Sequence, residues 1–302
     1  MADTELSSRH HYIPQLYIKG FCGDDGKISV YDKQSMKILP QRRPPRSMFW
    51  EQNRNISKIE GQNVDIIEKT YGTFETQWGP VFKVVRGEIP NESIDSKIGR
   101  LALKQFMASL YWRSPSIDSW ADEYIKTIDL TRMGKPITIN GKPLAENDKF
   151  VNQLRVDKEF RYYFRCFFLP LLTFNYTDGN DKLLNWNILR VEREEKNKHI
   201  SSDFPFVFND LNMFFNFNGN FLFPLSSDAV LLSTQKVIDM QSLPDTAWAI
   251  TNILSFAFSD RYICCGSEDY LRKVSGEYYI AADKIDKHEL LNALFDKLPY
   301  IG

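Results

Sequence analysis

Hydrophobic and polar positions follow different periods along the chain, and the change of period divides it into three regions. Residues 1–60 contain short apolar segments separated by turn residues, which is typical of strands. Residues 61–180 carry apolar residues at helical spacing, and residues 181–302 mix short strands with helices. Because helices and strands are segregated rather than strictly alternating, the pattern predicts an α+β fold, with an N-terminal hairpin and C-terminal strands around a helical middle region.

The N-terminal hairpin is predicted from residues 23–39, GDDGKISVYDKQSMKIL. This segment combines a Gly/Asp turn, the alternating strand ISVYD, a polar turn and a second strand that ends near Leu39. The next segment, QRRPPR at residues 41–46, is expected to be extended because consecutive prolines exclude a helix.

The remaining elements are predicted from periodicity and from turn or capping residues. Ser93 or Asp95 is the expected cap of the second helix, and Asn140-Gly141 is the expected turn of the central hairpin. The expected helices are 64–78, 94–112, 117–130, 145–172, 245–260 and 287–298; the expected hairpin is 135–144; and the expected strands are 185–194, 200–208, 221–225, 229–234 and 261–266.

Composition sets the class of protein. With 302 residues, 43% hydrophobic and 25% charged, the chain matches an ordinary globular protein rather than a disordered tail, a collagen-like fibre or a disulfide mini-protein. One compact domain, 1–302, is expected. The net charge of -1 excludes a protein that coats nucleic acid by bulk charge, although residues 1–50 hold eight Lys and Arg against five acidic residues.

The expected compartment is the cytoplasm, because the first residues contain no apolar signal-peptide core. The most apolar run, residues 160–174, is too short for a bilayer and is interrupted by Arg161 and Arg165, so a core helix and no membrane contact are predicted. The Phe-rich segment 204–223 is predicted to form buried strands, with an aromatic stacking surface for bases as the alternative. Reduced core thiols are expected for Cys22, Cys166, Cys264 and Cys265.

Candidate chemistry depends on few residues, since the standard phosphate-loop, nucleophile-elbow and zinc signatures are absent. Histidine occurs four times, and His10 and His11 are adjacent. On an extended chain they point to opposite sides, so one can face a pocket while the other supports it. The alternative is a pair of surface histidines on a loose terminus. The apolar residues that follow in the sequence argue against this alternative.

Four further groups have both a structural and a functional interpretation. Glu68 and Glu75 share one helix face, either in solvent or holding a metal ion or water. Arg113 either complements a helix dipole or binds an anion. Asp203 either caps a turn or contributes an acid at a strand end. Asn252, in an apolar helix, either ties the core together or lines a site.

The opening HHYIPQLYIKGF, followed by a strand that ends in Tyr31-Asp32, resembles the start of a mainly bacterial family known as domain of unknown function four-two-three-eight. Later segments extend the resemblance over nearly the whole chain: a Glu-bearing helix, the Arg113-Ser114-Pro115 helix end, the turn that begins at Ser202, the Phe-Pro-Leu strand and Asn252. The resemblance implies a shared fold and a common site for polar residues from separate segments, without a settled activity.

These observations lead to a first hypothesis and two alternatives. The first is a nuclease-like hydrolase that cleaves phosphodiester bonds, with nucleic acid as its partner and a divalent metal ion as the cofactor it would use. The second is a non-catalytic binding or sensing module in a stress or phage-defence system, in which the polar residues form a structural network. The third is an enzyme that processes nucleotides or small metabolites. The candidate residues are, as catalytic groups, His10, His11, Glu75 and Asp203; as substrate-binding groups, Arg113, Arg42, Arg43 and Asn252; and, as a metal ligand, Glu68.

Overall fold

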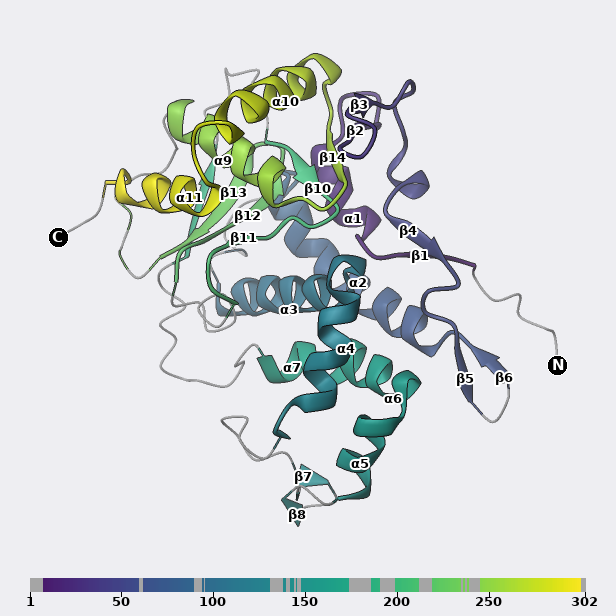
Figure 1. Cartoon of the computed structure of the whole chain (residues 1–302). Coiled ribbons are helices and arrows are strands. Elements are labelled where there is room, and N and C mark those ends of the chain that lie inside the picture. Colours follow the sequence, from purple (N-terminus) through teal and green to yellow (C-terminus); the bar gives the residue numbers. More distant parts are fainter. Residues whose placement is uncertain are drawn as a thin grey trace.

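The computed structural model describes residues 8–59, 62–89, 94, 96–130, 138–139, 142–143, 145, 148–173, 186–190, 199–211, 219–234, 236, 238 and 245–299. Helices and antiparallel sheets both occur in these residues, so the α+β prediction is confirmed. N-terminal and C-terminal segments lie together at one end of the molecule, and the helices of the middle region form the other end (Figure 1). None of the described helices is both long enough and apolar enough to span a membrane.

The predicted N-terminal hairpin is confirmed and becomes part of a sheet that C-terminal strands complete. Tyr31 pairs with Ile38 within the hairpin, and its first strand also pairs with β14, in which Cys264 faces Val30. The order in this antiparallel sheet is β10-β14-β2-β3. Its strands are β2 (Ser29–Asp32), β3 (Lys37–Ile38), β10 (Ser201–Ser202) and β14 (Tyr262–Cys265). A second antiparallel sheet, of order β11-β12-β13-β9, contains β9 (Trp186–Arg190), β11 (Val207–Phe208), β12 (Phe221–Ser226) and β13 (Ala229–Ser233).

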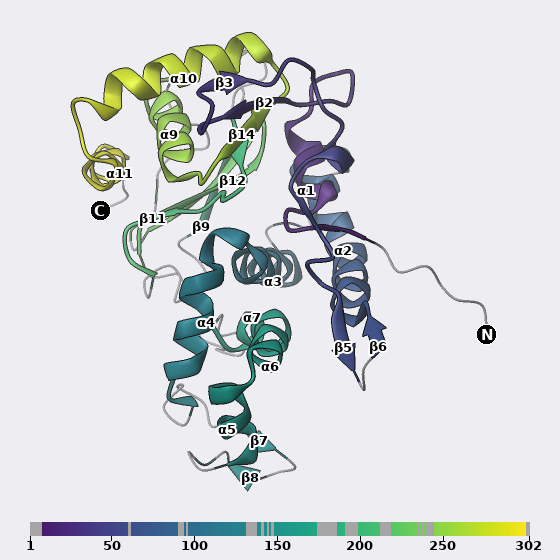
Figure 2. The same ribbon diagram turned by 45° about the vertical axis from the view of Figure 1, so that its right-hand side comes forward.

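Both sheets are covered by helices on both faces (Figure 2). Phe221 and Phe223 of β12 join the core cluster that contains residues of α1, α2 and α3, whereas Leu222 joins the cluster of α9 and α11. This explains why β12 and β13 are apolar up to their final serines instead of alternating with polar residues. The covering helices are α1 (Gln15–Ile18), α2 (Ile66–Val85) and α3 (Lys97–Arg113) on one side and α9 (Asp245–Phe258), α10 (Glu268–Ala282) and α11 (Lys287–Asp296) on the other.

Most residues predicted to be in the core are buried where the structure describes them, whereas Leu16, Cys22, Phe204 and Phe208 are only partly buried. The ring of Tyr17 contacts those of Phe106 and Phe223 at centroid distances of 5.5 and 5.6 Å, and its hydroxyl donates to the carbonyl of Pro224 at 2.7 Å. Phe206 and Phe221 are also buried, so the described part of the Phe-rich segment forms core; residues 212–218 lie outside the described residues. All four cysteines are unpaired thiols, three of them buried.

Three helices differ from their sequence predictions. The second half of α2 continues through Pro80 to Val85, beyond the predicted end at Trp78. The cap of α3 is Ser96, whose side chain accepts the N–H of Gly99 at 3.1 Å, rather than Ser93 or Asp95. The helix α10 was not predicted, although Leu271, Val274 and Tyr278 recur in it at helical spacing around Gly276.

The middle region contains a group of helices, with the hairpins β5-β6 and β7-β8 near them, whereas β1 and β4 pair within the N-terminal region (Figure 2). Inside the helical run that was expected over 145–172, a π-helical segment at Phe164–Phe168 separates α6 from α7. Two-stranded pairs join β1 with β4, β5 with β6 and β7 with β8; the predicted turn at Asn140-Gly141 lies outside the described residues. The helices are α4 (Asp118–Thr127), α5 (Lys149–Val156), α6 (Lys158–Tyr163) and α7 (Leu169–Thr173), and the strands are β1 (Arg9–His11), β4 (Trp50–Gln52), β5 (Ser57–Ile59), β6 (Gln62–Val64), β7 (Thr138–Ile139) and β8 (Lys142–Pro143).

Candidate functional site

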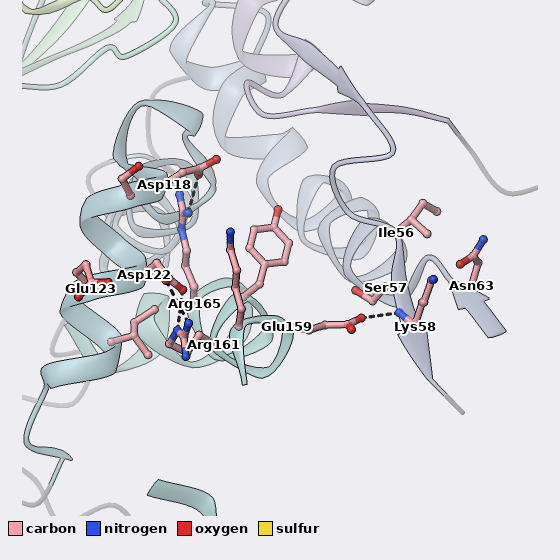
Figure 3. Close-up of a pocket in the computed structure, with 14 residues that line it drawn as sticks. Ile56, Ser57, Lys58, Asn63, Asp118, Asp122, Glu123, Glu159, Arg161 and Arg165 are labelled. Carbon is pink, nitrogen blue, oxygen red and sulfur yellow. Dashed lines mark hydrogen bonds and ion pairs between the residues drawn. The ribbon is translucent and has the colours of Figure 1, made fainter. Parts of the chain in front are cut away.

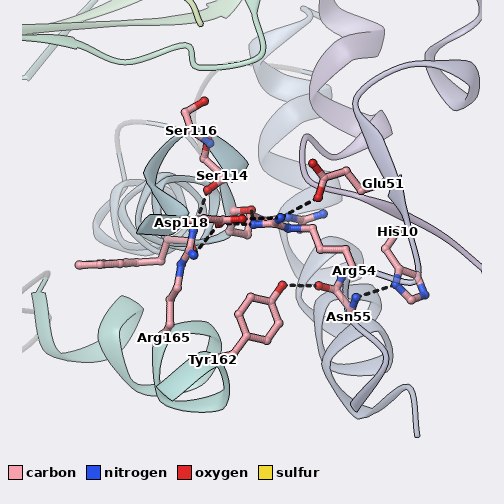
Figure 4. A network of polar contacts seen from close by, with 11 residues as sticks. His10, Glu51, Arg54, Asn55, Ser114, Ser116, Asp118, Tyr162 and Arg165 are labelled. Atoms are coloured by element: carbon pink, nitrogen blue, oxygen red, sulfur yellow. Dashed lines mark hydrogen bonds and ion pairs between the residues drawn. The ribbon is translucent and has the colours of Figure 1, made fainter. Parts of the chain in front are cut away.

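His10 belongs to a buried hydrogen-bond network. Its side chain has no exposed surface, and its Nδ1 accepts the backbone N–H of Asn55 at 2.8 Å. The amide of Asn55 donates to Oε2 of Glu68 at 2.7 Å and accepts from the hydroxyl of Tyr162 at 2.9 Å. Figure 4 shows Asn55 between His10 and Tyr162. The structure therefore brings the predicted residues His10 and Glu68 together through Asn55, but it leaves His10 no surface that a substrate can touch.

His11, Glu75 and Arg113 form a second group next to this network. Arg113 donates to the backbone carbonyl of His11. It also forms an ion pair with Glu75, in which Nη1 of Arg113 lies 3.3 Å from Oε1 of Glu75. Its guanidinium also lies over the ring of Tyr71, with Cζ 4.4 Å from the ring centroid. Arg113 is buried, whereas 28% of the Glu75 side chain is exposed. The structure thus unites three predicted site residues from β1, α2 and the end of α3.

The ionisation of this second group is shifted. Burial raises the pKa of Glu75 above its ordinary value, although the neighbouring Arg113 opposes this effect. Burial also lowers the pKa of His11, while its hydrogen bond to the carbonyl of Arg46 acts in the opposite direction. Glu75 and His11 both contact Arg113, His11 through its backbone carbonyl, and shifted pKa values of this kind occur at acid–base sites and also in structural ion-pair networks.

The two histidines are expected to respond differently to removal. His10→Ala deletes a fully buried ring and leaves the N–H of Asn55 without its acceptor, so we expect a loss of about 2 kcal/mol of folding free energy. His11→Ala removes a half-exposed ring whose backbone carbonyl still receives Arg113, so we expect a loss below about 1 kcal/mol. Urea unfolding of the two variants measures both values; equal losses would contradict the different roles assigned here.

Asp203 lies apart from these groups and performs the turn-capping role. Its Oδ2 accepts the backbone N–H of Arg261 and of Tyr262, each at 2.8 Å, and its Oδ1 accepts that of Asp260 at 3.1 Å. Burial raises the pKa of Asp203 to about 6, against the effect of these three N–H donors. The carboxylate is thus engaged in holding the start of β14.

The other predicted substrate-binding residues also bond inside the protein. Arg42 donates to the carbonyl of Gly266 at 2.6 Å and pairs with Asp25 at 2.9 Å, next to the close approach of the Gly23 and Gly266 backbones. Arg43 exchanges backbone hydrogen bonds with Ile28. Asn252, which is fully buried, accepts the N–H of Ile200 and donates to the carbonyl of Trp248 and the hydroxyl of Tyr270. For Asn252 the structure favours the interpretation that it ties the core together.

Glu68 was also considered as a metal ligand. Its Oε2 accepts from Asn55, and in the part of the chain that the structure describes no group of three or more His, Cys, Asp or Glu residues is placed to hold a metal ion.

A feature that was not predicted from the sequence is a bridge of Arg54, Asp118 and Arg165, called the arginine bridge here. Both guanidiniums reach Oδ1 of Asp118 at 2.6 Å (Figure 4). Arg54 also donates to the carbonyl of Arg113 at 3.2 Å, and Arg165 to that of Ser114 at 2.6 Å. The bridge therefore caps the C-terminal end of α3 and links the N-terminal region, α4 and the π-helical segment. Although burial acts to raise it, the two arginines hold the pKa of Asp118 below its ordinary value.

Asp118 and Arg165 of the arginine bridge line one wall of a cavity of about 750 Å³. Figure 3 shows Asp118, Asp122 and Glu123 of α4 on one side and Ser57 and Lys58 of β5 on the other, with residues of α6 between them. The cavity is lined by Ile56, Ser57, Lys58, Asn63, Asp118, Ser119, Asp122, Glu123, Ile125, Lys158, Glu159, Arg161, Tyr162 and Arg165. Tyr162 connects the cavity to the His10 network, because its hydroxyl bonds to Asn55.

Two sequence signals pointed toward this cavity. Arg161 and Arg165 lie four residues apart in the most apolar run of the chain, and both are buried. Buried arginines require partners, and Asp118 and Asp122 have the same four-residue spacing on α4. The spacing of the two pairs was visible in the sequence; their contact across two helices depends on tertiary structure.

Comparison with known proteins supports the sequence resemblance. The model of a family described as "Protein of unknown function (DUF4238)" matches residues 9–165. The chain belongs to this family. The segment that matches DUF4238 contains the arginine bridge, both histidine groups and every residue that lines the cavity, whereas Asp203 and Asn252 follow it. No curated protein and no solved structure showed significant similarity to the chain.

Proposed function

We propose that this DUF4238 protein is a non-catalytic binding module whose ligand occupies the cavity between β5, α4 and α6. The observation that carries the proposal is the cavity itself. Its volume of about 750 Å³ lies within the range of small-molecule sites, roughly 300 to 1,000 Å³. Its lining is mostly polar, and two isoleucines and the ring of Tyr162 lie among charged groups from three segments of the chain.

The local backbone supports this choice of site. Arg165 lies in the π-helical segment Phe164–Phe168, and single π-helical turns inside α-helices are frequent at functional sites. The hydrogen bonds of Arg161 to Asp122 and of Arg165 to Asp118 fix the cavity walls before a ligand arrives. A wall that is already ordered lowers the entropy cost of binding.

The residues first considered for hydrolysis support a structural interpretation instead. His10 is buried and bonded to Asn55, and Asp203 caps a turn with both of its oxygens. These groups therefore act in the network that positions Tyr162 and β14, which is the role that the binding-module hypothesis assigns to them.

A phosphodiester hydrolase remains the second candidate function because of one observation. His11 and Glu75 have shifted pKa values, and both bond to Arg113 outside the cavity. The His11→Ala protein described above separates the two candidates when it is assayed with bis-p-nitrophenyl phosphate and single-stranded DNA. Under the binding-module proposal, the wild-type protein hydrolyses neither substrate. Under the hydrolase hypothesis, the wild-type protein hydrolyses at least one of them and the His11→Ala protein loses that activity.

A variant that fills the cavity tests the proposal. Ser119→Trp places an indole in the cavity from an exposed helix position, and Gln77→Trp, on the exposed side of α2, is the matched control. A small-molecule panel is screened by thermal unfolding. A ligand at about a hundred times its Kd is expected to raise the Tm of the wild-type and Gln77→Trp proteins by about 5 °C, and that of Ser119→Trp by much less. If ligands stabilise all three proteins equally, the cavity is not the binding site.

A further inference from the structure

We infer that the ligand of this cavity is a small anion, a molecule whose phosphate or carboxylate group is held by Lys58 and Lys158. The inference rests on the proposed binding function and adds the chemical class of the ligand. It follows from the charges on the cavity walls, because acidic and basic residues line the cavity in equal number but differ in whether they already have partners.

The acidic side chains are already engaged. Asp122 receives two hydrogen bonds from Arg161, at 2.6 and 3.2 Å, and Asp118 is held by the arginine bridge. Glu123 pairs with Lys126 at 3.4 Å, and Glu159 accepts the backbone N–H of Lys58 at 2.5 Å. A cationic ligand would have to compete with these contacts.

The two lysines differ from the acids in this respect. Lys58 enters the cavity lining from β5 and Lys158 from the first residue of α6, and both are exposed to solvent. Within the described residues neither ammonium group makes a hydrogen bond or an ion pair. The charge of Lys158 acts at longer range, where it helps Arg161 to lower the pKa of Asp122. The donors that remain for a ligand are therefore cationic.

The arginine bridge leaves the balance of charge at the cavity wall neutral. Arg54 and Arg165 share the carboxylate of Asp118, so two buried guanidinium charges meet one acid at the cavity wall, and Glu51 compensates Arg54 from a more exposed position. Tyr162 contributes no negative charge, because burial raises its pKa far above its ordinary value. An anion near the two lysines is thus stabilised by direct contact with their ammonium groups, which form no ion pair with a described residue.

The test uses pairs of probes that differ mainly in charge: adenosine 5′-monophosphate with adenosine, glucose 6-phosphate with glucose, and succinate with succinamide. Calorimetric titration of the full-length protein is expected to detect at least one of the three anions and to show at least tenfold weaker binding of its neutral counterpart. Affinity is expected to fall as salt is added, because the exposed ammonium groups are screened.

Variants connect this result to the two lysines. Lys58→Gln and Lys158→Gln are each expected to weaken binding of that anion by about tenfold. The control Lys273→Gln, which removes an exposed lysine from α10, is expected to leave the affinity unchanged. Whether phosphate or carboxylate is the preferred group follows from which anions bind.

The outcomes that overturn the inference are distinct from those that overturn the proposed function. If a neutral probe binds as tightly as its anion and Ser119→Trp abolishes that binding, the binding module stands and the anionic class is wrong. The same holds if both lysine variants keep full affinity. If no probe binds, or if Ser119→Trp leaves binding intact, both proposals fail. Tight binding of single-stranded DNA but of none of the small anions would also contradict the small-anion class.

Discussion

Arg165→Met is expected to lower the free energy of unfolding by about 3 kcal/mol, because it removes a buried charge from a shared ion pair. The guanidinium of Arg165 donates to Asp118 and to the carbonyls of Trp112 and Ser114, and only 4% of its side chain is exposed. Methionine fills similar volume but donates nothing, so the two carbonyls at the end of α3 lose their donor. Arg54 retains Asp118, which keeps the loss below that of a fully orphaned acid.

Urea unfolding followed by circular dichroism measures this loss. The matched control is Arg272→Met, which breaks an exposed pair with Glu268 on α10 and is expected to change stability by less than about 0.5 kcal/mol. A loss for Arg165→Met as small as that of the control would show that the arginine bridge does not hold α3, α4 and the π-helical segment together.

The second large effect concerns the pH dependence of stability, to which two buried residues, His199 and Asp203, contribute in opposite directions. Burial lowers the pKa of His199 from 6.5 to about 4, so the unfolded chain takes up a proton first and stability is lost as the pH falls from 6.5 toward 4. Burial raises the pKa of Asp203 from 3.8 to about 6, so the folded chain takes up a proton first and stability is gained as the pH falls from 6 toward 3.8. Each effect amounts to about 3 kcal/mol, and together they nearly cancel.

Two variants separate these effects. The stability difference between wild type and His199→Gln is expected to shrink by about 3 kcal/mol between pH 7 and pH 4, because the variant has no imidazole to protonate on unfolding. The difference between wild type and Asp203→Asn is expected to grow by about the same amount, because only the wild type gains stability from protonation of the carboxyl. Unfolding free energies measured in urea at several pH values give both slopes; parallel curves for all three proteins would contradict the burial argument.

The sequence was most informative where local patterns decide the structure. The hairpin around Tyr31 follows from its turn residues, and the apolar runs of β12 and β13 follow from burial on both faces. The helix α10 escaped prediction because its few buried residues, such as Leu271 and Val274, contact a sheet formed by distant segments. Local periodicity carries little information about a helix that tertiary contacts stabilise.

The candidate site was predicted in part. Sequence patterns single out individual residues, whereas the contacts between those residues depend on the fold. The sequence named His11, Glu75 and Arg113 among a larger set of candidates that also included Asp203; the structure joins the first three through Arg113 and places Asp203 apart from them. The sequence did not identify Asn55, which joins His10 to Glu68 and Tyr162, because nothing in its local pattern distinguishes it from other asparagines. The cavity arises from three separate segments, residues 56–63, 118–125 and 158–165, so its location required the fold.

The most direct test of the central claim, that the cavity holds an anionic ligand, is the rate at which individual lysines react with an amine-acylating reagent. The protein is labelled with and without a mixture of adenosine 5′-monophosphate, glucose 6-phosphate and succinate, and modified peptides are quantified by mass spectrometry. The account predicts that Lys58 and Lys158 react at least about fivefold more slowly in the presence of the anions, whereas the exposed Lys273 and Lys284 react at unchanged rates. Unchanged rates at Lys58 and Lys158, or equal protection of all four lysines, would contradict it.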